Sequence, residues 1–262
     1  MAIVFGLASG SLADAQQVPD PRVHDIVQSG KIRLALFLPG YTKSPAGEVR
    51  GSGTGAVAVE LARALAARLG IQVQLIEHPK PPQVVVCLKA HACDLAYMGV
   101  DPSRAAEVGF SLPFMQQDFT YLVPAGSPIR SVADADRRGV RIAVVRDHAA
   151  TIALTRSLKN AETIPFDVPS AAFEAIQAGR ADTWASARFG LLQSAGKLPG
   201  SRVLEDRYGA NFVALAVPKD RIGRLAYVSE FVEEAKASGL VQRAIDGAGL
   251  RGYQVVLPKK PN

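Results

Sequence analysis

Apolar residues follow two alternating patterns in the first half of the chain: short buried runs and longer amphipathic stretches. In one amphipathic stretch Leu61, Leu65 and Leu69 are spaced four residues apart, which predicts a helix that Gly70 ends. The buried runs predict strands at 31–39, 71–78 and 93–100, and the stretches between them predict helices at 56–70 and 81–92. This order, βαβαβ, is typical of a parallel sheet with crossover helices.

A second set with the same order follows. Strands are expected at 119–127, 140–146, 161–167 and 182–187, with helices at 132–139, 148–159 and 170–179. The strand predicted at 211–219 then returns to the first set, and 224–249 is predicted as a C-terminal helix. We therefore expect an α/β protein of two lobes, each with a mainly parallel sheet flanked by helices, joined by two crossing strands. Lobe 1 is expected at 31–122 and 214–256 and lobe 2 at 123–213, with a ligand between them.

Composition narrows the class of protein. Of the 262 residues, 48% are hydrophobic and 21% charged, which is ordinary globular composition. The formal net charge is +6, but Lys and Arg are spread along the chain without a basic run or aromatic stacking set. We therefore expect a solvated basic surface that attracts small anions, and no nucleic-acid partner.

The first fifteen residues carry a short apolar stretch followed by small residues that end in Ala13-Asp14-Ala15. An A-x-A pattern of this kind is typical of a cleaved export signal, although no Lys or Arg occurs before Arg22. We interpret 1–15 as the remnant of a signal peptide; a loosely packed N-terminus is the alternative. Export would place the chain in an oxidising compartment, the periplasm.

Cys87 and Cys93 are the two cysteines, and five residues separate them. They are expected to form a disulfide or to remain as two buried thiols. Two cysteines do not make a metal site, and His91 between them does not complete one. No phosphate-binding loop, zinc motif or nucleophile–base pair is recognisable, so no metal, cofactor or catalytic residue is expected.

Several stretches taken in order resemble a known family. They are KIRLALF, VELARALAARLG, CLKAHACDLAYMGVDPSRAAEVGFSLPF, SPIRSVADADRRGVRIAV and AFEAIQAGRADTWAS. Together they resemble the extracellular solute-binding proteins, family 3, of ABC transporters, the polar amino-acid type, over about 31–256. The resemblance implies the type II periplasmic binding protein fold and a monomer without enzymatic activity. It also implies a protein that closes on a small ligand by hinge bending and delivers it to a membrane permease.

The family holds the α-carboxylate of its ligand with an arginine, the amides of an adjacent turn and a helix start in the other lobe. By resemblance the arginine is Arg104 and the turn is Gly99-Val100-Asp101. The helix start is Asp147-His148-Ala149. A guanidinium gives two charge-assisted hydrogen bonds to a carboxylate, so these residues are expected to form an anion clamp. Asp101 has an alternative role as the cap of the helix that begins at Pro102.

The chain departs from the family where an ammonium group would bind. The two acidic positions of the amino-acid binders are Phe37 and Ala187 here. A buried ammonium without a partner costs several kcal/mol, so we expect an organic acid in place of a zwitterion. The remaining residues expected around the ligand are Phe37, Tyr41 and Tyr97 as apolar walls, His148 as a second anion contact or proton switch, and Ser186.

Two other functions were weighed against binding. The fold is shared with enzymes that resemble cyclohexadienyl dehydratase, in which a carboxylate acts as a general acid. Only Asp101 and Asp147 stand near the expected site, and both look like helix caps. An interaction module of a signalling system is the third alternative, for which the chain carries no fused kinase or membrane segment.

Overall fold

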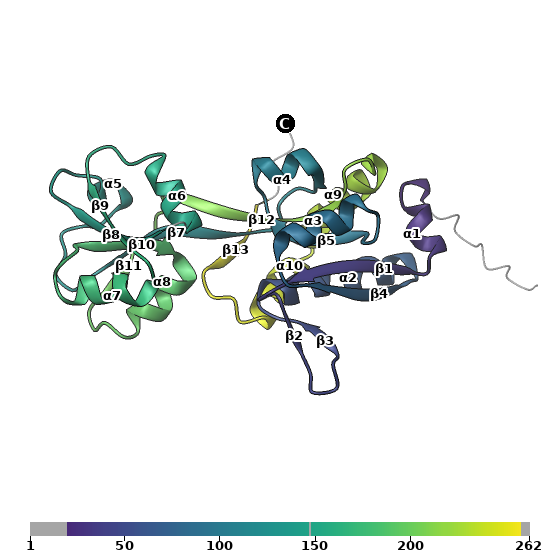
Figure 1. The fold of residues 1–262 in the computed structure, drawn as a ribbon, viewed down its shortest axis with the longest axis horizontal. Helices are drawn as coiled ribbons and strands as arrows, with labels where there is room; N and C mark the ends of the chain where they lie inside the picture. The colour runs from purple at the N-terminus through teal and green to yellow at the C-terminus, as the bar shows by residue number, and fades with distance from the viewer. Residues whose placement is uncertain (1–19, 147, 258–262) are drawn as a thin grey trace, which may run out of the picture.

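The structure of the protein is a computed structural model that describes residues 20–146 and 148–257. It is elongated, with two lobes at the ends of its long axis and long strands running between them (Figure 1). Eleven strands form one continuous sheet, whose main path is β4-β1-β5-β12-β7-β10-β8-β9. The chain thus has the expected mixed α/β architecture of a type II periplasmic binding protein.

The sheet of lobe 1 is built on three parallel strands, β1 (Lys31–Phe37), β4 (Gln72–His78) and β5 (Leu95–Gly99). Helices cover both faces because the strands are apolar on both sides. The helices before and between these strands are η1 (Pro21–Val23), α1 (His24–Gln28), α2 (Thr54–Leu69) and α3 (Pro81–Lys89), and α4 (Pro102–Glu107) follows β5. The Gly-rich segment after β1 forms a hairpin of β2 (Tyr41–Lys43) and β3 (Val49–Gly51).

Lobe 2 repeats the plan with β8 (Arg141–Val145), β9 (Glu162–Phe166) and β10 (Thr183–Ala187) in parallel. Its helices are α5 (Val132–Ala135), α6 (Ala149–Thr155), α7 (Pro169–Gln177) and α8 (Arg188–Ala195). Separate apolar clusters lie on the two faces of this sheet, one around Tyr121 and Leu154 and the other around Trp184 and Ile176. Each lobe therefore has a core of its own.

Two antiparallel strands, β7 (Met115–Val123) and β12 (Gly209–Pro218), cross between the lobes. The first half of β7 pairs with β12 and its second half with β10, so one strand belongs to both lobes. The expected lobe limits at residues 123 and 213 fall within these two strands. Three short strands add to them: β6 (Val108–Phe110) on β12, and β11 (Arg202–Val203) and β13 (Tyr253–Val255) on β7.

The C-terminal helix differs from the sequence-based expectation. It was expected to run unbroken over 224–249, but the structure has α9 (Ile222–Ala237) and α10 (Leu240–Gly247). The break lies at Gly239, whose φ of 75° is left-handed, a conformation that ends an α-helix and that glycine adopts at little cost. The turn lets α10 pack on both α2 and α9.

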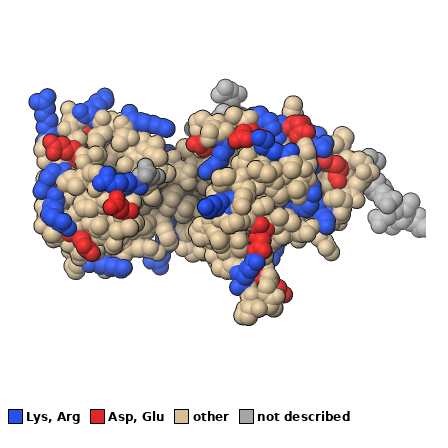
Figure 2. Space-filling model, viewed as in Figure 1, with Lys and Arg blue, Asp and Glu red and all other residues tan. Residues whose placement is uncertain are grey.

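The distribution of charged side chains and the length of the helices bear on which kinds of partner the protein can bind. Lys and Arg lie on both lobes in the face that Figure 2 shows, with Asp and Glu between them, and do not gather into one stripe. None of the helices within 20–146 and 148–257 is long and apolar enough to cross a bilayer. The segment interpreted as a signal-peptide remnant, 1–15, lies outside the described residues.

Candidate ligand site between the lobes

The carboxyl ends of strands from both lobes converge on the crossing strands. Gly99, the last residue of β5, pairs with Val213 of β12, and Ala187, the last residue of β10, pairs with Phe119 of β7. The residues that follow these strands therefore face the region between the lobes. In open α/β sheets this edge is where ligands bind, because loops and helix starts lie there with free polar groups.

Arg104 lies on α4, directly after β5. Its side chain is half-buried, and its Nη1 donates a hydrogen bond of 3.1 Å to the carbonyl of Gly99. No carboxylate within the described ranges lies within ion-pairing distance of Arg104, although most other arginines of the protein are paired. Its remaining N–H groups are thus available to an anion at the end of β5.

The turn beside Arg104 offers fewer free amides than expected. The Val100 N–H donates to the carbonyl of Phe212 at 2.8 Å, because β12 continues opposite the turn. Asp101 caps α4 by accepting from the amides of Ser103 at 2.9 Å and Arg104 at 3.4 Å and from the Ser103 hydroxyl. The Ser103 hydrogen bonds lower the pKa of Asp101, so its carboxylate is ionised at neutral pH. The turn is therefore closed by its own contacts, and it leaves the Arg104 guanidinium as the charged donor at this strand end.

Gly99 has a role that its own sequence context did not indicate. A Cβ on Gly99 would stand 2.9 Å from Oδ1 of Asn211, so glycine allows this amide to approach the end of β5. In the sheet register Asn211 lies opposite Gln117, and Gln117 lies opposite Tyr253. Paired residues share a face, so these three polar side chains form a row across the crossing strands that sequence reasoning missed. The one sequence signal is the polar run Gln-Gln-Asp inside an otherwise apolar strand.

Aromatic residues at the end of β1, in β5 and at the start of β2 form a supported wall. Phe37 stacks on Tyr97 with ring centroids 5.0 Å apart and planes 14° apart. Tyr97 is 2% exposed, and burial raises its pKa to about 12, against a smaller opposing effect of the Thr54 hydroxyl. Gly40 packs so closely on the Tyr97 hydroxyl that a Cβ there would overlap it. Tyr97 therefore backs Phe37, while Phe37 and Tyr41, the first residue of β2, keep partly exposed faces.

In lobe 2 the start of α6 stands at the carboxyl end of β8. His148 caps this helix: its Nδ1 accepts from the Ala150 amide at 3.2 Å, and burial lowers its pKa. The ring is thus neutral at pH 7, and Ala149 beside it is exposed. Asp147, the first residue of the expected helix start, lies outside the described residues.

Ser186 and Ala187 point in opposite directions, since successive strand residues alternate between faces. Ser186 is 7% exposed and lies opposite Thr120, whereas Ala187 lies opposite Phe119. Ala187 is also the residue that precedes α8. At the end of β10, the methyl group of Ala187 therefore lies on the same face of the sheet as the ring of Phe119.

A buried ionic network crosses the same strands, and the sequence did not reveal it. Asp118 is 4% exposed and accepts hydrogen bonds from Arg207 at 2.7 Å, Gln116 at 3.2 Å and Gln254 at 3.4 Å. Arg188 is also buried: it lies 3.6 Å from Asp118 and donates to the carbonyls of 204, 205 and 206. A cavity of about 740 Å³ adjoins the network. Asp118 is neutralised by two arginines, so it is not a free partner for an ammonium group.

The sequence matches the profile of the bacterial extracellular solute-binding proteins, family 3, over residues 44–247. No curated protein matches it. Similar solved structures include an ancestral cyclohexadienyl dehydratase, with 24% identity over 89% of this chain and 98% of that one and a TM-score of 0.62. The solute receptor for L-cysteine of Neisseria gonorrhoeae has 24% identity over 88% and 94%, with a TM-score of 0.55.

An ancestral cationic amino-acid solute-binding protein has 22% identity over 86% of this chain and 98% of that one, with a TM-score of 0.63. At these identities the solved structures show a common fold, and the profile match, which spans most of the chain, shows the family. The chain belongs to the bacterial extracellular solute-binding proteins, family 3.

Proposed function

We propose that this protein captures a small ligand carrying a carboxylate between its two lobes and delivers it to the membrane permease of an ABC importer. The observation that carries the proposal is Arg104, a half-buried cation at the end of β5 with no carboxylate partner among the described residues. The nearby Asp101 carboxylate caps α4 and forms no ion pair with this half-buried guanidinium, so a ligand carboxylate can take charge-assisted hydrogen bonds from it.

The ligand is an organic acid in preference to an α-amino acid. Phe37 and Ala187 stand where the family places acidic residues, and the carboxylates of Asp101 and Asp118 are occupied by a helix cap and by two arginines. An ammonium group enclosed here would lose its hydration without a counter-charge. The Phe37 ring stacked on Tyr97 supports an apolar or aromatic body for the ligand. Amino acids are the ligands named for two of the structural relatives, so they form the comparison arm of the test.

Capture requires the lobes to close, and β7 and β12 are the segments about which they would turn. Closure would bring the β8–α6 connection, with His148, toward the carboxylate held on Arg104. We infer a periplasmic monomer that presents the closed form to the permease, in keeping with the extracellular location of the family.

Binding is tested by thermal shift and calorimetry with a panel of keto acids, aromatic acids and dicarboxylates beside the corresponding amino acids. A ligand at about 100 times its Kd stabilises the native state by about 2.7 kcal/mol, which a thermal shift detects. Arg104→Gln is expected to weaken binding about 10- to 100-fold, because charge-assisted hydrogen bonds of about 1.5–3 kcal/mol are lost.

The matched control is Arg138→Gln, which removes an exposed arginine before the amino end of β8, away from the convergence of strand ends. Affinity should be unchanged in this variant. Equal affinity of wild type and Arg104→Gln would refute the clamp, and tight binding of α-amino acids alone would refute the ligand class.

A dehydratase activity is the alternative, since one structural relative is an ancestral cyclohexadienyl dehydratase. Of the carboxylates at the ends of β5 and in β7, Asp101 is engaged in a helix cap and Asp118 is paired with two arginines, so neither is placed to serve as a general acid. Incubation with prephenate and arogenate should therefore give no product above the uncatalysed rate. Product formation abolished by Asp101→Asn would establish the enzyme instead.

A further inference from the structure

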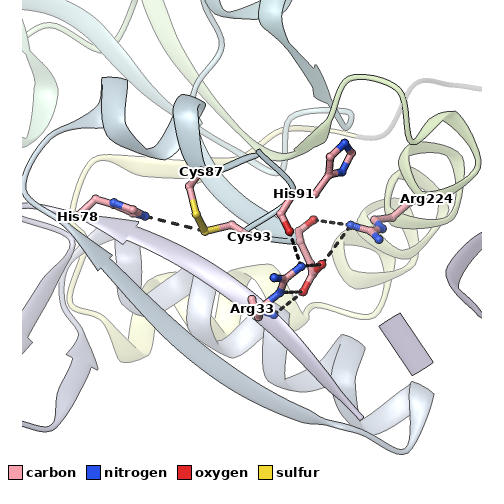
Figure 3. Close-up of a disulfide and its surroundings, with 7 residues drawn as sticks. Arg33, His78, Cys87, His91, Cys93 and Arg224 are labelled. Carbon is pink, nitrogen blue, oxygen red and sulfur yellow. Dashed lines mark hydrogen bonds and ion pairs between the residues drawn. A yellow bond between two sulfur atoms is a disulfide. The ribbon is translucent and has the colours of Figure 1, made fainter. Parts of the chain in front are cut away.

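The disulfide of lobe 1 has a histidine beside it. Cys87, on α3, and Cys93, just before β5, are joined with their Cα atoms 5.4 Å apart. The Nε2 atom of His78, the last residue of β4, lies 3.9 Å from Sγ of Cys93. Figure 3 shows the imidazole pointing at the sulfur pair from the end of β4. His91, the histidine nearest in sequence, turns instead toward Asp220, with Nε2 3.4 Å from its carboxylate.

These three side chains offer the donor atoms that zinc prefers. The two sulfurs and the imidazole nitrogen all lie within 4.8 Å of one another. Zn–S and Zn–N bonds of about 2.3 and 2.0 Å place the ligands of one ion roughly 3.3–3.8 Å apart in a tetrahedron, so small movements suffice once the sulfurs separate.

The burial of the three residues suits a bound ion. Cys87 and Cys93 are 7% and 0% exposed, and they pack in an apolar cluster with Leu88 and Met98. His78 is partly exposed and lies at the end of its strand, so an ion has an entry path on one side. In the sheet register His78 is the partner of Phe37, which places this group one strand away from the aromatic wall of the ligand site.

We propose that reduction of the Cys87–Cys93 disulfide converts this group into a Zn²⁺ site with ligands Sγ of Cys87, Sγ of Cys93 and Nε2 of His78. A dithiol reductant breaks the S–S bond by supplying two electrons and two protons, and it leaves as its own disulfide. Both thiol protons are released when the ion binds to the thiolates. Three protein ligands leave the fourth tetrahedral position to water or a small anion. The oxidised protein holds the same atoms in a covalent bond and has no such site.

The test compares the full chain in its oxidised and reduced forms. Protein reduced with a phosphine, freed of reductant under anaerobic conditions, is titrated with Zn²⁺ against a chromophoric chelator, and far-UV circular dichroism follows the fold. One equivalent should bind to the reduced form and none to the oxidised form. His78→Ala, reduced in the same way, should bind at least about tenfold more weakly, since even loss of an outer-sphere partner costs about 10- to 100-fold.

His91→Ala is the matched control, because it removes a histidine close in sequence that does not face the sulfurs, and its affinity should equal that of wild type. Three results would overturn the proposal. They are equal Zn²⁺ affinity in the oxidised form, equal affinity in reduced His78→Ala, and failure of the reduced wild type to bind. Loss of the native circular dichroism on reduction would also overturn it, since the three ligands then no longer meet.

Discussion

A substitution at Asp118 tests whether the buried ionic network stabilises the crossing strands β7 and β12. The change Asp118→Asn keeps the shape of the side chain and removes its charge. In the wild type this carboxylate accepts the hydrogen bond of Arg207 at 2.7 Å and faces Arg188 at 3.6 Å. Both arginines come from lobe 2, whereas Gln254, which donates to the second oxygen, comes from the C-terminal strand.

The expected loss of stability follows from burial. The Arg207 side chain is 43% exposed, so its pair is screened by water and contributes less than about 1 kcal/mol. The Arg188 side chain is only 9% exposed, and leaving a buried charge without its partner costs about 3–5 kcal/mol. Because Arg188 keeps its three carbonyl acceptors and the pair is long, the lower part of that range applies. We expect a total loss of about 3–4 kcal/mol, or roughly 6–16 °C in Tm for a chain of this size.

Urea and thermal denaturation followed by circular dichroism measure this loss. Asp167→Asn serves as the control, because Asp167 pairs with Arg146 at a site where its side chain is 85% exposed. The control should change the free energy of unfolding by less than about 0.5 kcal/mol. If Asp118→Asn were as stable as the control, the Asp118 network would not contribute to the stability of the crossing strands.

Two further predictions concern a helix cap and a close backbone contact. Because burial lowers the pKa of His148, its contribution to stability is complete above the unfolded-state pKa of about 6.5 and is lost as the pH falls toward the folded-state pKa. His148→Asn, which caps without titrating, should lose less stability than wild type between about pH 7.5 and 5.5; parallel pH profiles would contradict this. Gly55→Ala would place a Cβ 1.8 Å from the carbonyl oxygen of Gly40, and should cost about 3 kcal/mol in urea denaturation. Gly190→Ala, a helical position with nothing within 4 Å, should instead gain about 0.5–1 kcal/mol, and similar effects of the two changes would refute the steric argument.

Much of the fold could be predicted from the sequence because its signals are local. The apolar runs predicted the strands β1, β4, β5, β8, β9, β10 and β12 and the helices between them, with limits within a few residues. The sequence missed α8 and the short strands β6, β11 and β13, and the strand expected at 119–127 is β7, which begins and ends four residues earlier. The three strands are two or three residues long, which is too short to give a periodic pattern in the sequence. They form only by pairing with β7 or β12.

The candidate site was predicted in part. Arg104 does stand at the end of β5, where the order of strand, turn and helix placed it. The amide of Val100 was expected to be free, but Phe212, more than a hundred residues later, accepts its hydrogen bond. The burial of Arg188 against Asp118 could not be predicted from the sequence either, because this contact depends on the pairing of β10 with β7.

The sequence by itself determined the two-lobed α/β plan, the family and the position of a cation after a strand, because these depend on residues that are neighbours along the chain. Only the tertiary structure decided that His78 faces the Cys87–Cys93 sulfurs and that Asp118 is neutralised. Which side chains meet across a sheet depends on strand order and register, and a shift of one residue would turn each of them to the opposite face.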